Sequence, residues 1–295
     1  MDMVIECRDL YYAYGGKSAL HGVGFSVGRG SVFGLLGKNG AGKSTVINML
    51  MGFLQPSKGS CRVFGEKSHA LSATARSRIG LLLEGFVQYD FMSPGELERY
   101  YGSLYPQWER DVFFDLIKWM HMPFSRPLSR MSNGQRSQVV LGLIMAQRPE
   151  LMILDDYSMG LDVGYRRLFI DFLREYVLLY GTTVLLTSHV VQELDCVIDE
   201  MVVLKDGRVC VCMSKKEFMN SFRGFCFERT AESLAIQPDS FVRGVDHTSR
   251  TSSVYGFFDE WELKRYLVEH GISFNGFTPV EMSFEDAFVG LTGKY

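Results

Sequence analysis

The chain has 295 residues, of which 46% are hydrophobic and 22% charged, and its formal net charge is −3. This composition is typical of a globular protein of about two domains, and the nearly balanced charge gives no electrostatic reason to expect nucleic acid as a partner. No apolar run reaches the roughly 18 residues that span a membrane, and residues 1–6 lack the basic start and apolar core of a signal peptide, so we expect a cytoplasmic protein that meets membranes only through a partner.

Residues 4–36 alternate short apolar runs with turn residues, a pattern that predicts strands and hairpins. Tyr14 closes an aromatic stretch, residues 11–14, that lies upstream of a glycine-rich loop. A tyrosine at this position has two interpretations: it stacks on an adenine ring, or it is half-buried on a strand, as tyrosines commonly are. The residues alone leave both open.

A complete G-x-x-x-x-G-K-[ST] pattern lies between an apolar run that predicts a buried strand, residues 32–36, and one that predicts a helix, residues 46–51. Its glycines let backbone N–H groups face one point, and the following helix adds its positive N-terminal dipole, so the loop suits an anion. Lys43 can reach the β- and γ-phosphates of a nucleotide, and the Ser44 hydroxyl can ligate Mg²⁺. The alternative is a glycine-rich turn with a chance lysine, which the flanking strand and helix disfavour. The predicted phosphate loop consists of Gly37, Lys38, Asn39, Gly40, Ala41, Gly42, Lys43, Ser44 and Thr45.

Two further strands are predicted over residues 61–65 and 79–84. The second is apolar enough to be buried on both faces of a parallel sheet. It ends at Glu84, whose carboxylate is either a surface loop charge or an oxygen ligand for Mg²⁺.

From Pro94 to about residue 148 the hydrophobic pattern becomes helical. Trp108 and Trp119 follow helical spacing and are predicted to be core residues, or alternatively to line a groove for a partner helix. Further along, Ser132 precedes an apolar helix. It either only caps that helix or, together with Gly134, presents a second anion site at the helix N-terminus.

Four apolar residues, 151–154, are followed by Asp155 and Asp156. A buried parallel strand delivers the residues at its C-terminal end into the ligand crevice of an α/β sheet. Beside a phosphate loop, Asp155 is therefore predicted to ligate Mg²⁺ and Asp156 to activate the attacking water. An ordinary loop with two acids is the alternative.

Residues 183–188 are also predicted to form a buried strand. His189 stands at its end. A lone histidine is usually structural, but this one shares the strand-end edge with Asp155 and Asp156, which favours a catalytic or sensing role.

The remaining pattern is one of local elements without chemical motifs. A helix is predicted over residues 165–180, and a hairpin over residues 201–212 with its turn at residues 206–207. Three elements are predicted nearer the C-terminus: strand-like segments over residues 254–258 and 271–274 and a helix over residues 259–270.

Taken in order, these motifs resemble those of the ATP-binding subunit of an ABC transporter, over residues 3–214. Tyr14 matches the adenine-stacking aromatic, and residues 283–293 resemble the C-terminal extension of the drug-exporter-like branch. Six motifs carry the resemblance: the Walker A motif over residues 37–45, the Q-loop position at Glu84, the signature motif over residues 131–135, the Walker B motif over residues 151–156, the D-loop over residues 158–162 and the switch histidine at His189.

The resemblance implies the α/β fold of a P-loop NTPase of the ABC ATPase type, with a mostly parallel core sheet and an antiparallel N-terminal part. The ATP-binding domain would span residues 1–214, with a helical subdomain inserted over about residues 86–147. Residues 215–295 would form a small C-terminal accessory α/β region.

The resemblance also implies Mg-dependent ATP hydrolysis that powers substrate movement, by export, through separate integral membrane subunits at the inner face of the cell membrane. Those subunits would dock on the helical insert. Two cassettes, identical or different, would pair head to tail so that each signature motif closes on the ATP of the other subunit, with no role for nucleic acid. The residues implied are Asp156, His189 and Lys43 in catalysis, Ser44, Glu84 and Asp155 at Mg²⁺, and Ser132, Asn133, Gly134, Gln135 and Asp162 at the ATP in trans.

The chain departs from the family pattern at three places. Asn133 stands where a glycine is usual, and asparagine tolerates left-handed backbone better than most residues. Glu84 replaces the commoner glutamine but still offers an oxygen to Mg²⁺. Asp156 stands where the catalytic glutamate normally lies, and Tyr157 where a proline follows.

The exchange at Asp156 changes reach rather than basicity, because the intrinsic pKa values of aspartate and glutamate are close. One methylene fewer is roughly 1.5 Å, and a misplacement of about 1 Å can cost on the order of a hundredfold in rate. In one hypothesis the backbone has shifted to compensate, and the chain is an ordinary or slow ATPase. In the other, it binds ATP but hydrolyses it poorly, as the regulatory half of a heterodimer. A soluble non-transport ATPase of the same family is a further alternative.

Overall fold

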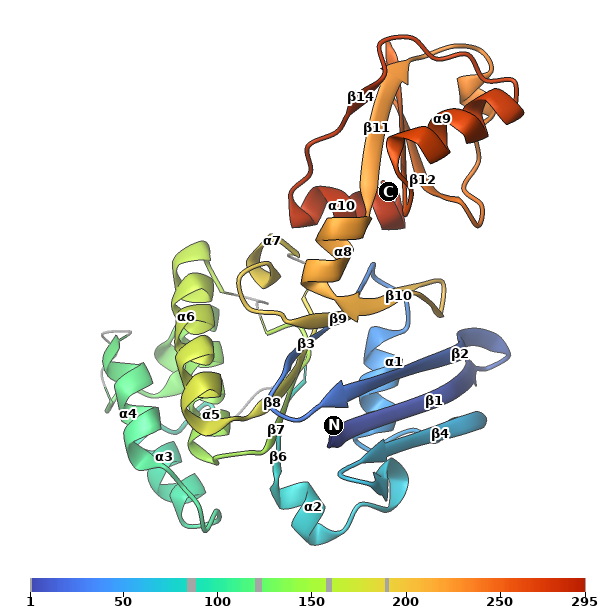
Figure 1. The fold of residues 1–295 in the computed structure, drawn as a ribbon. Helices are drawn as coiled ribbons and strands as arrows, with labels where there is room; N and C mark the ends of the chain where they lie inside the picture. Colours follow the sequence, from blue (N-terminus) through green and yellow to red (C-terminus); the bar gives the residue numbers. More distant parts are fainter. Residues whose placement is uncertain (1, 84–88, 120–123, 158–160, 189–190, 295) are drawn as a thin grey trace. The chain divides into compact units, whose positions relative to one another are not determined.

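The computed structural model of the protein describes residues 2–83, 89–119, 124–157, 161–188 and 191–294. The chain divides into two compact units, Met1–Cys212 and Met213–Tyr295, which Figure 1 traces from the N- to the C-terminus. All the motifs predicted to bind nucleotide belong to the first unit.

An antiparallel sheet forms the N-terminal part of the first unit, with its strands in the order β2-β1-β4-β5. Gly15 and Gly16 join the first two strands, and their φ angles are both positive, 51° and 88°. A two-residue hairpin turn of this kind matches the twist of the strands that it connects, and it places Tyr14 at the end of its strand. The four strands are β1 (Met3–Tyr14), β2 (Lys17–Gly28), β4 (Lys58–Val63) and β5 (Glu66–Lys67).

A six-stranded sheet forms the centre of the unit, in the order β10-β9-β3-β8-β7-β6. Its strands are β3 (Val32–Gly37), β6 (Ile79–Leu82), β7 (Leu151–Leu154), β8 (Thr183–Leu186), β9 (Glu200–Lys205) and β10 (Arg208–Ser214). The neighbouring pairs from β6 to β9 are all parallel, so the mostly parallel core sheet is confirmed. Every residue of β3, β7 and β8 is buried, which explains their nearly continuous apolar sequences. The hairpin of β9 and β10 turns at Asp206 and Gly207, as predicted.

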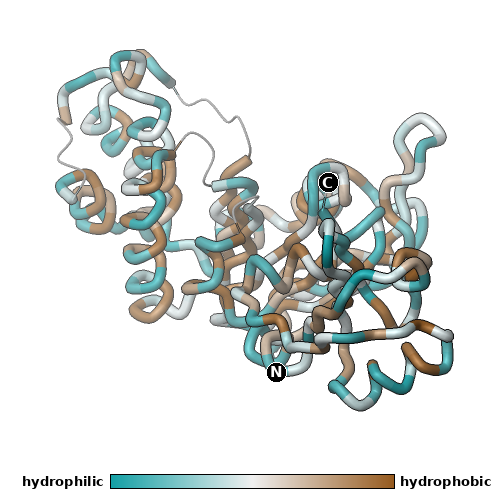
Figure 2. The backbone as a smooth tube through the Cα atoms, turned by 90° about the horizontal axis from the view of Figure 1, so that it is seen from above, coloured by the Kyte–Doolittle hydropathy of each residue, from teal (hydrophilic) through white to brown (hydrophobic). Residues whose placement is uncertain are grey.

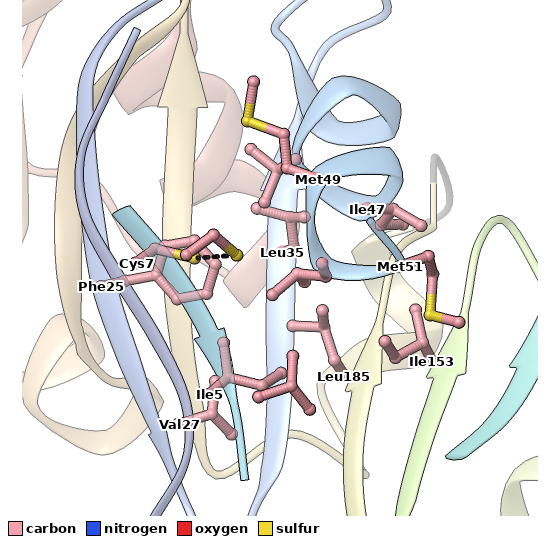
Figure 3. Close-up of a cluster of buried hydrophobic side chains, with 14 of the residues drawn as sticks. Ile5, Cys7, Phe25, Val27, Leu35, Ile47, Met49, Met51, Ile153 and Leu185 are labelled. Atoms are coloured by element: carbon pink, nitrogen blue, oxygen red, sulfur yellow. Dashed lines mark hydrogen bonds between the residues drawn. The ribbon is translucent and has the colours of Figure 1, made fainter. Parts of the chain in front are cut away.

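Side chains of both sheets pack with α1 (Lys43–Leu50) into one hydrophobic cluster (Figure 3). Ile5 and Phe25 come from the antiparallel sheet, Leu35 from β3 and Ile47 from α1, and all four are buried. Burial of each such side chain contributes about 1.5–3 kcal/mol. The cluster therefore fixes β3 and α1, the two elements that flank the predicted phosphate loop.

Among the residues described between β6 and β7, three helices form and have a hydrophobic cluster of their own. They are α3 (Pro94–Gly102), α4 (Arg110–Trp119) and α5 (Asn133–Ala146). Ser93 and Glu96 form a capping box at the start of α3. Both α3 and α4 combine buried apolar residues with exposed polar ones, whereas α5 is buried over most of its length; Figure 2 colours the whole backbone by hydropathy. The predicted helical region is confirmed. The prediction of a core position is wrong for Trp119, which is 48% exposed because the last turn of α4 carries it outward, where its ring meets Phe172 edge-on.

The other helices of the first unit connect its strands. The helix predicted over residues 165–180 is confirmed as α6, whose N-cap is Asp162 and whose C-cap is Gly181 in the left-handed conformation. These helices are α2 (Ala73–Ser77), α6 (Val163–Tyr180) and α7 (Val191–Leu194), with 3₁₀ turns at Ser68–Ala70 and Leu128–Arg130.

The second unit has a four-stranded antiparallel sheet in the order β12-β13-β11-β14. Its elements are α8 (Lys215–Ser221), β11 (Arg223–Glu228), a 3₁₀ turn at Ser233–Ala235, β12 (Val242–His247), β13 (Thr251–Gly256), α9 (Glu260–Glu269), β14 (Thr278–Pro279) and α10 (Phe284–Thr292). The predicted helix over residues 259–270 is confirmed as α9.

The strand predicted over residues 271–274 is wrong. Gly271 has a positive φ and ends α9, and Ile272 donates its backbone N–H to the Leu267 carbonyl rather than to a strand. Ile272 and Phe274 still turn toward the hydrophobic cluster of this unit, so the alternating pattern reports side-chain burial without strand pairing. In the described part of both units, no helix is long and apolar enough to cross a membrane.

An arginine–glutamate network ties together the starts of β6 and β7 and the turn after β2. Glu150 accepts from Arg78 Nε at 2.5 Å and from an Arg29 guanidinium nitrogen at 2.8 Å. Hydrogen bonds from Arg78 are the main cause that lowers the pKa of Glu150 to about 2. This lowered pKa makes the folded state more stable above the unfolded pKa, near 4.3, and that stabilisation is lost as the pH falls toward 2.

We therefore expect Glu150→Gln to lower the free energy of unfolding by about 1 kcal/mol at pH 7, a small value because the pair is partly solvent-screened. The difference from wild type should shrink between pH 4.5 and pH 2. Urea titrations at several pH values measure both. Glu109→Gln, which breaks an ion pair with Arg148 at 3.2 Å, is the matched control, and a pH-independent difference for Glu150→Gln would contradict this account.

Candidate functional site

The phosphate loop runs from the end of β3 to the start of α1 and depends on its glycines. Gly37, Gly40 and Gly42 have φ angles of 149°, 80° and 104°, in the region that disfavours residues with a side chain. A Cβ at Gly37 would lie 2.5 Å from the Leu204 carbonyl oxygen, and one at Gly42 would lie 2.6 Å from Leu20 Cδ2. Neither position therefore accepts alanine without a shift of its neighbours.

Lys43, the first residue of α1, holds the loop together. Its ammonium group donates to the carbonyl oxygens of Gly37 at 2.7 Å and of Lys38 at 3.1 Å, and the backbone N–H of Ala41 donates to Lys38 at 3.1 Å. The ammonium is thus folded back over the loop at the N-terminus of a helix, where the helix dipole adds positive potential. An anion placed there would meet a lysine and a ring of backbone N–H groups.

A cavity of about 670 Å³ opens in front of the loop, a size within the range of small-molecule sites. Most of the predicted ATP-binding and catalytic residues that the structure describes line it. Gly37 and Ala41 are buried in the loop beneath it. The cavity is lined by Tyr14, Lys17, Ser18, Ala19, Asn39, Gly40, Gly42, Lys43, Ser44, Thr45, Asp155, Asp156, Thr187 and Ser188.

Tyr14 lines this cavity and is 48% exposed. Its ring packs edge-on against Tyr12, with ring centroids 4.8 Å apart, and its hydroxyl lies 3.4 Å from Thr45 Oγ1. Nearly half of the Tyr14 surface is therefore accessible. Tyr14 therefore lines the cavity from the end of β1, and its stacking on adenine stays a prediction.

The two aspartates follow β7 and reach the same cavity from the sheet. Thr187, directly after β8, donates from its hydroxyl to Asp155 Oδ1 at 2.8 Å and accepts the Asp156 backbone N–H at 2.8 Å. Asp156 has a φ of 47°, a left-handed conformation that aspartate adopts more readily than most residues. The parallel alignment of β7 and β8 brings these residues together although 31 positions separate Asp156 from Thr187.

Asp155 is buried beside a second carboxylate and close to a lysine. Burial is the first cause that raises the pKa of Asp155, and the neighbouring Asp156 charge adds to it. Hydrogen bonds from Thr187 and Ser44 and the Lys43 charge act in the opposite direction. The Asp155 carboxylate and Ser44 hydroxyl are oxygen donors of the kind that Mg²⁺ takes alongside substrate phosphates and water, so the residues present fit this ion.

The residues predicted to act in trans lie elsewhere and do not line the cavity of their own chain. Ser132 is the N-cap of α5, and its hydroxyl accepts the Gln135 N–H at 3.2 Å while the Gln135 side chain accepts the Ser132 N–H at 3.1 Å. Asp162 caps α6 and accepts the Tyr165 N–H at 3.0 Å. Each therefore has a local role as a helix cap.

Two predicted site residues, Glu84 and His189, lie outside the described residues, as do residues 158–160 of the D-loop. Sequence reasoning overlooked five residues that line the cavity: Lys17, Ser18, Ala19, Thr187 and Ser188. A signal for the last two was present, since they end an apolar strand at the same edge as Asp155.

Comparison with known proteins gives a consistent result. A protein-family model described as "ABC transporter" matches residues 20–158. The chain is 31% identical to the Nod factor export ATP-binding protein I of Rhizobium sp. (strain N33), over 99% of this chain and 98% of the relative. It is 33% identical to the protein of the same name from Sinorhizobium fredii (strain NBRC 101917 / NGR234), over 71% of this chain but only 62% of that relative, less than two thirds of its length.

Solved structures agree on the fold. An ATP-binding subunit of an ABC transporter matches with a TM-score of 0.65 and 25% identity, over 74% of this chain and 92% of that one. A dimeric bacterial ABC transporter cassette matches with a TM-score of 0.62 over 71% and 98% of the two chains, and its 19% identity supports the fold alone.

The fold and the cavity define a P-loop ATPase of the ABC class. ABC cassettes form dimers and work with membrane subunits. The chain belongs to the ABC transporter family, as an ATP-binding subunit.

Proposed function

We propose that the chain binds ATP in the cavity in front of residues 37–45 and hydrolyses it to ADP and phosphate. The observation that carries this proposal is the convergence of the phosphate loop and the two strand-end aspartates on one cavity. Tyr14 would stack on the adenine, and the loop N–H groups with Lys43 would hold the β- and γ-phosphates. Of the other members of the predicted loop, Asn39, Gly40, Gly42 and Thr45 line the same cavity, whereas Gly37, Lys38 and Ala41 do not.

Asp156 would accept a proton from the attacking water, which makes the water a better nucleophile at the γ-phosphorus. Asp155 and Ser44 would hold Mg²⁺, which when bound neutralises charge that develops on the phosphate oxygens. The contributions of Glu84 to the metal site and of His189 to catalysis remain predictions made from the sequence.

We further propose that two copies, or this chain and a relative, close head to tail over two ATP molecules. Ser132 and Asp162 are the N-caps of α5 and α6, and neither they nor Gly134 line the cavity of their own chain. Helix N-termini placed outside that cavity are suited to a phosphate held by another subunit. Asn133 and Gln135, in the first turn of α5, would complete that contact.

The transported substrate would leave the cell, because the relatives are named for Nod factor export. The chain would work at the inner face of the cell membrane, through integral membrane subunits that dock on the helical part between β6 and β7. The aromatic side chains of Tyr89, Phe91 and Tyr100 support this docking, since they are 46%, 71% and 42% exposed and their rings contact one another.

A detergent extraction tests the transport role. The tagged chain should bring down an integral membrane protein, and ATPase activity of the reconstituted complex should respond to its presence. Phe91→Ser should weaken this association while ATP binding is unchanged, and Leu178→Ser, which alters a comparably exposed residue on α6, is the control. A fully active ATPase that associates with no membrane protein would instead be a soluble member of the family.

The regulatory alternative rests on one observation, the short side chain of Asp156. If it holds, the chain binds ATP and closes the dimer, while a partner cassette carries most of the hydrolysis. Hydrolysis rates of Asp156 variants distinguish an active ATPase from a regulatory subunit.

A further inference from the structure

Asp156 has an unusual backbone conformation for the residue that carries the proposed base. Its φ of 47° lies in the left-handed region, where residues with a side chain are uncommon and where aspartate is several-fold over-represented. The direction of its carboxylate depends on this conformation, because the Cα–Cβ bond turns with the backbone. A contact that keeps the backbone of Asp156 left-handed therefore also sets the direction of its carboxylate.

Thr187 is in a position to hold Asp156 in this conformation. Its hydroxyl accepts the Asp156 backbone N–H at 2.8 Å and donates its own proton to Asp155 Oδ1 at 2.8 Å. A threonine hydroxyl is both a donor and an acceptor, so one oxygen links the peptide of Asp156 to the carboxylate of Asp155. Thr187 is 1% exposed, which shields both hydrogen bonds from competing water.

The other side of Asp156 is also fixed. Tyr157 is 1% exposed, and its ring packs on Phe169 of α6 with centroids 5.3 Å apart. Asp156 thus stands between a buried aromatic anchor in the chain and a buried hydroxyl on the neighbouring strand. Rotation of its peptide would break the Thr187 contact while Tyr157 keeps the chain from following.

We propose that Thr187 is a positioning residue for ATP hydrolysis: it holds Asp156 in the left-handed conformation and orients Asp155 at the same time. The inference rests on the proposed function, in which Asp156 is the base. It also accounts for aspartate in place of glutamate at this position, because a left-handed backbone accepts aspartate more readily than glutamate. The left-handed backbone also changes the direction in which the carboxylate extends toward the phosphates.

The test compares Thr187→Val with Thr187→Ser. Valine keeps the shape and removes both hydrogen bonds, so kcat should fall by about tenfold to a hundredfold while KM and the Kd for ATP change less than about threefold. Serine keeps the hydroxyl and should restore most of kcat. Thr182→Val is the matched control, since Thr182 is a buried threonine at the other end of β8 whose hydroxyl donates to Pro149 O at 3.0 Å.

Amide hydrogen exchange at Asp156 supplies a readout that does not depend on turnover. Loss of its acceptor in Thr187→Val should speed exchange of the Asp156 N–H at least about tenfold relative to wild type and to Thr182→Val. If exchange accelerates and kcat stays at the wild-type value, or if Thr187→Ser is as slow as Thr187→Val, Thr187 does not position the reaction. Should wild type itself hydrolyse no faster than Asp156→Asn, the proposed function fails, whereas the exchange result still reports on the Thr187 contact.

Discussion

Replacement of Asp156 by asparagine should lower kcat for ATP hydrolysis by at least about a hundredfold, with the Kd for ATP changed less than about threefold. A positioned general base contributes about 10²–10⁴-fold to a rate, and an amide cannot take the proton. Asparagine matches aspartate in size and in its tolerance of left-handed backbone, so the φ of 47° and the bond from the Asp156 N–H to Thr187 should persist. The variant thus removes the basic oxygen and little else.

Steady-state hydrolysis at saturating MgATP measures this effect, with equilibrium binding of ATP measured in parallel. Asp156→Glu is the informative companion: glutamate is basic but longer and less suited to the left-handed region, so we expect it to hydrolyse more slowly than wild type. Equal rates for wild type and Asp156→Asn would show that the chain is the regulatory half of a pair. A faster Asp156→Glu would show that the backbone has not adapted to aspartate.

Local patterns account for the parts of the fold that were predicted. The G-x-x-x-x-G-K-[ST] stretch contains the glycines, the lysine and the helix start within nine residues, so the loop could be placed from the sequence alone. The strands β7 and β8 could be recognised because burial on both faces leaves nearly all of their positions apolar. In these cases the determining contacts are close in the sequence or uniform along an element.

Contacts between distant residues set the limits of prediction. The pairing of Thr187 with Asp155 and Asp156 depends on the register of β7 beside β8, which no local pattern encodes. The strand predicted over residues 271–274 failed for the converse reason: Ile272 and Phe274 alternate with polar residues, but no neighbouring strand pairs with them. The burial of alternate side chains gives a period that the sequence reveals. The strand with which a segment pairs leaves no such local pattern.

Residues 132–135 show how one pattern can serve two purposes. The capping box that links Ser132 and Gln135 satisfies the start of α5 within the chain. The same helix start leaves further N–H groups for an anion. A cap within the chain and a contact in trans are therefore compatible.

Replacement of Lys43 by methionine should weaken ATP binding by about 10- to 100-fold. A hydrogen bond to a charged group contributes about 1.5–3 kcal/mol, and each 1.4 kcal/mol is a tenfold change in affinity. Lys43 also donates to the carbonyl oxygens of Gly37 and Lys38 in this structure, so its loss should loosen the loop that presents the N–H groups. Methionine keeps the length and the apolar stem of the side chain, which limits the change to the ammonium group.

Because the ammonium is expected to contact the β- and γ-phosphates, the loss of affinity should be larger for ATP than for AMP, whose single phosphate lies nearer the ribose. Titrations of both nucleotides against wild type and Lys43→Met test this order, and thermal unfolding without nucleotide separates loop stability from phosphate contact. Lys67→Met, which changes an exposed lysine of β5 outside the cavity, is the control. An equal loss for the two nucleotides would mean that Lys43 acts through loop structure, and unchanged ATP affinity would place the phosphates elsewhere in the cavity.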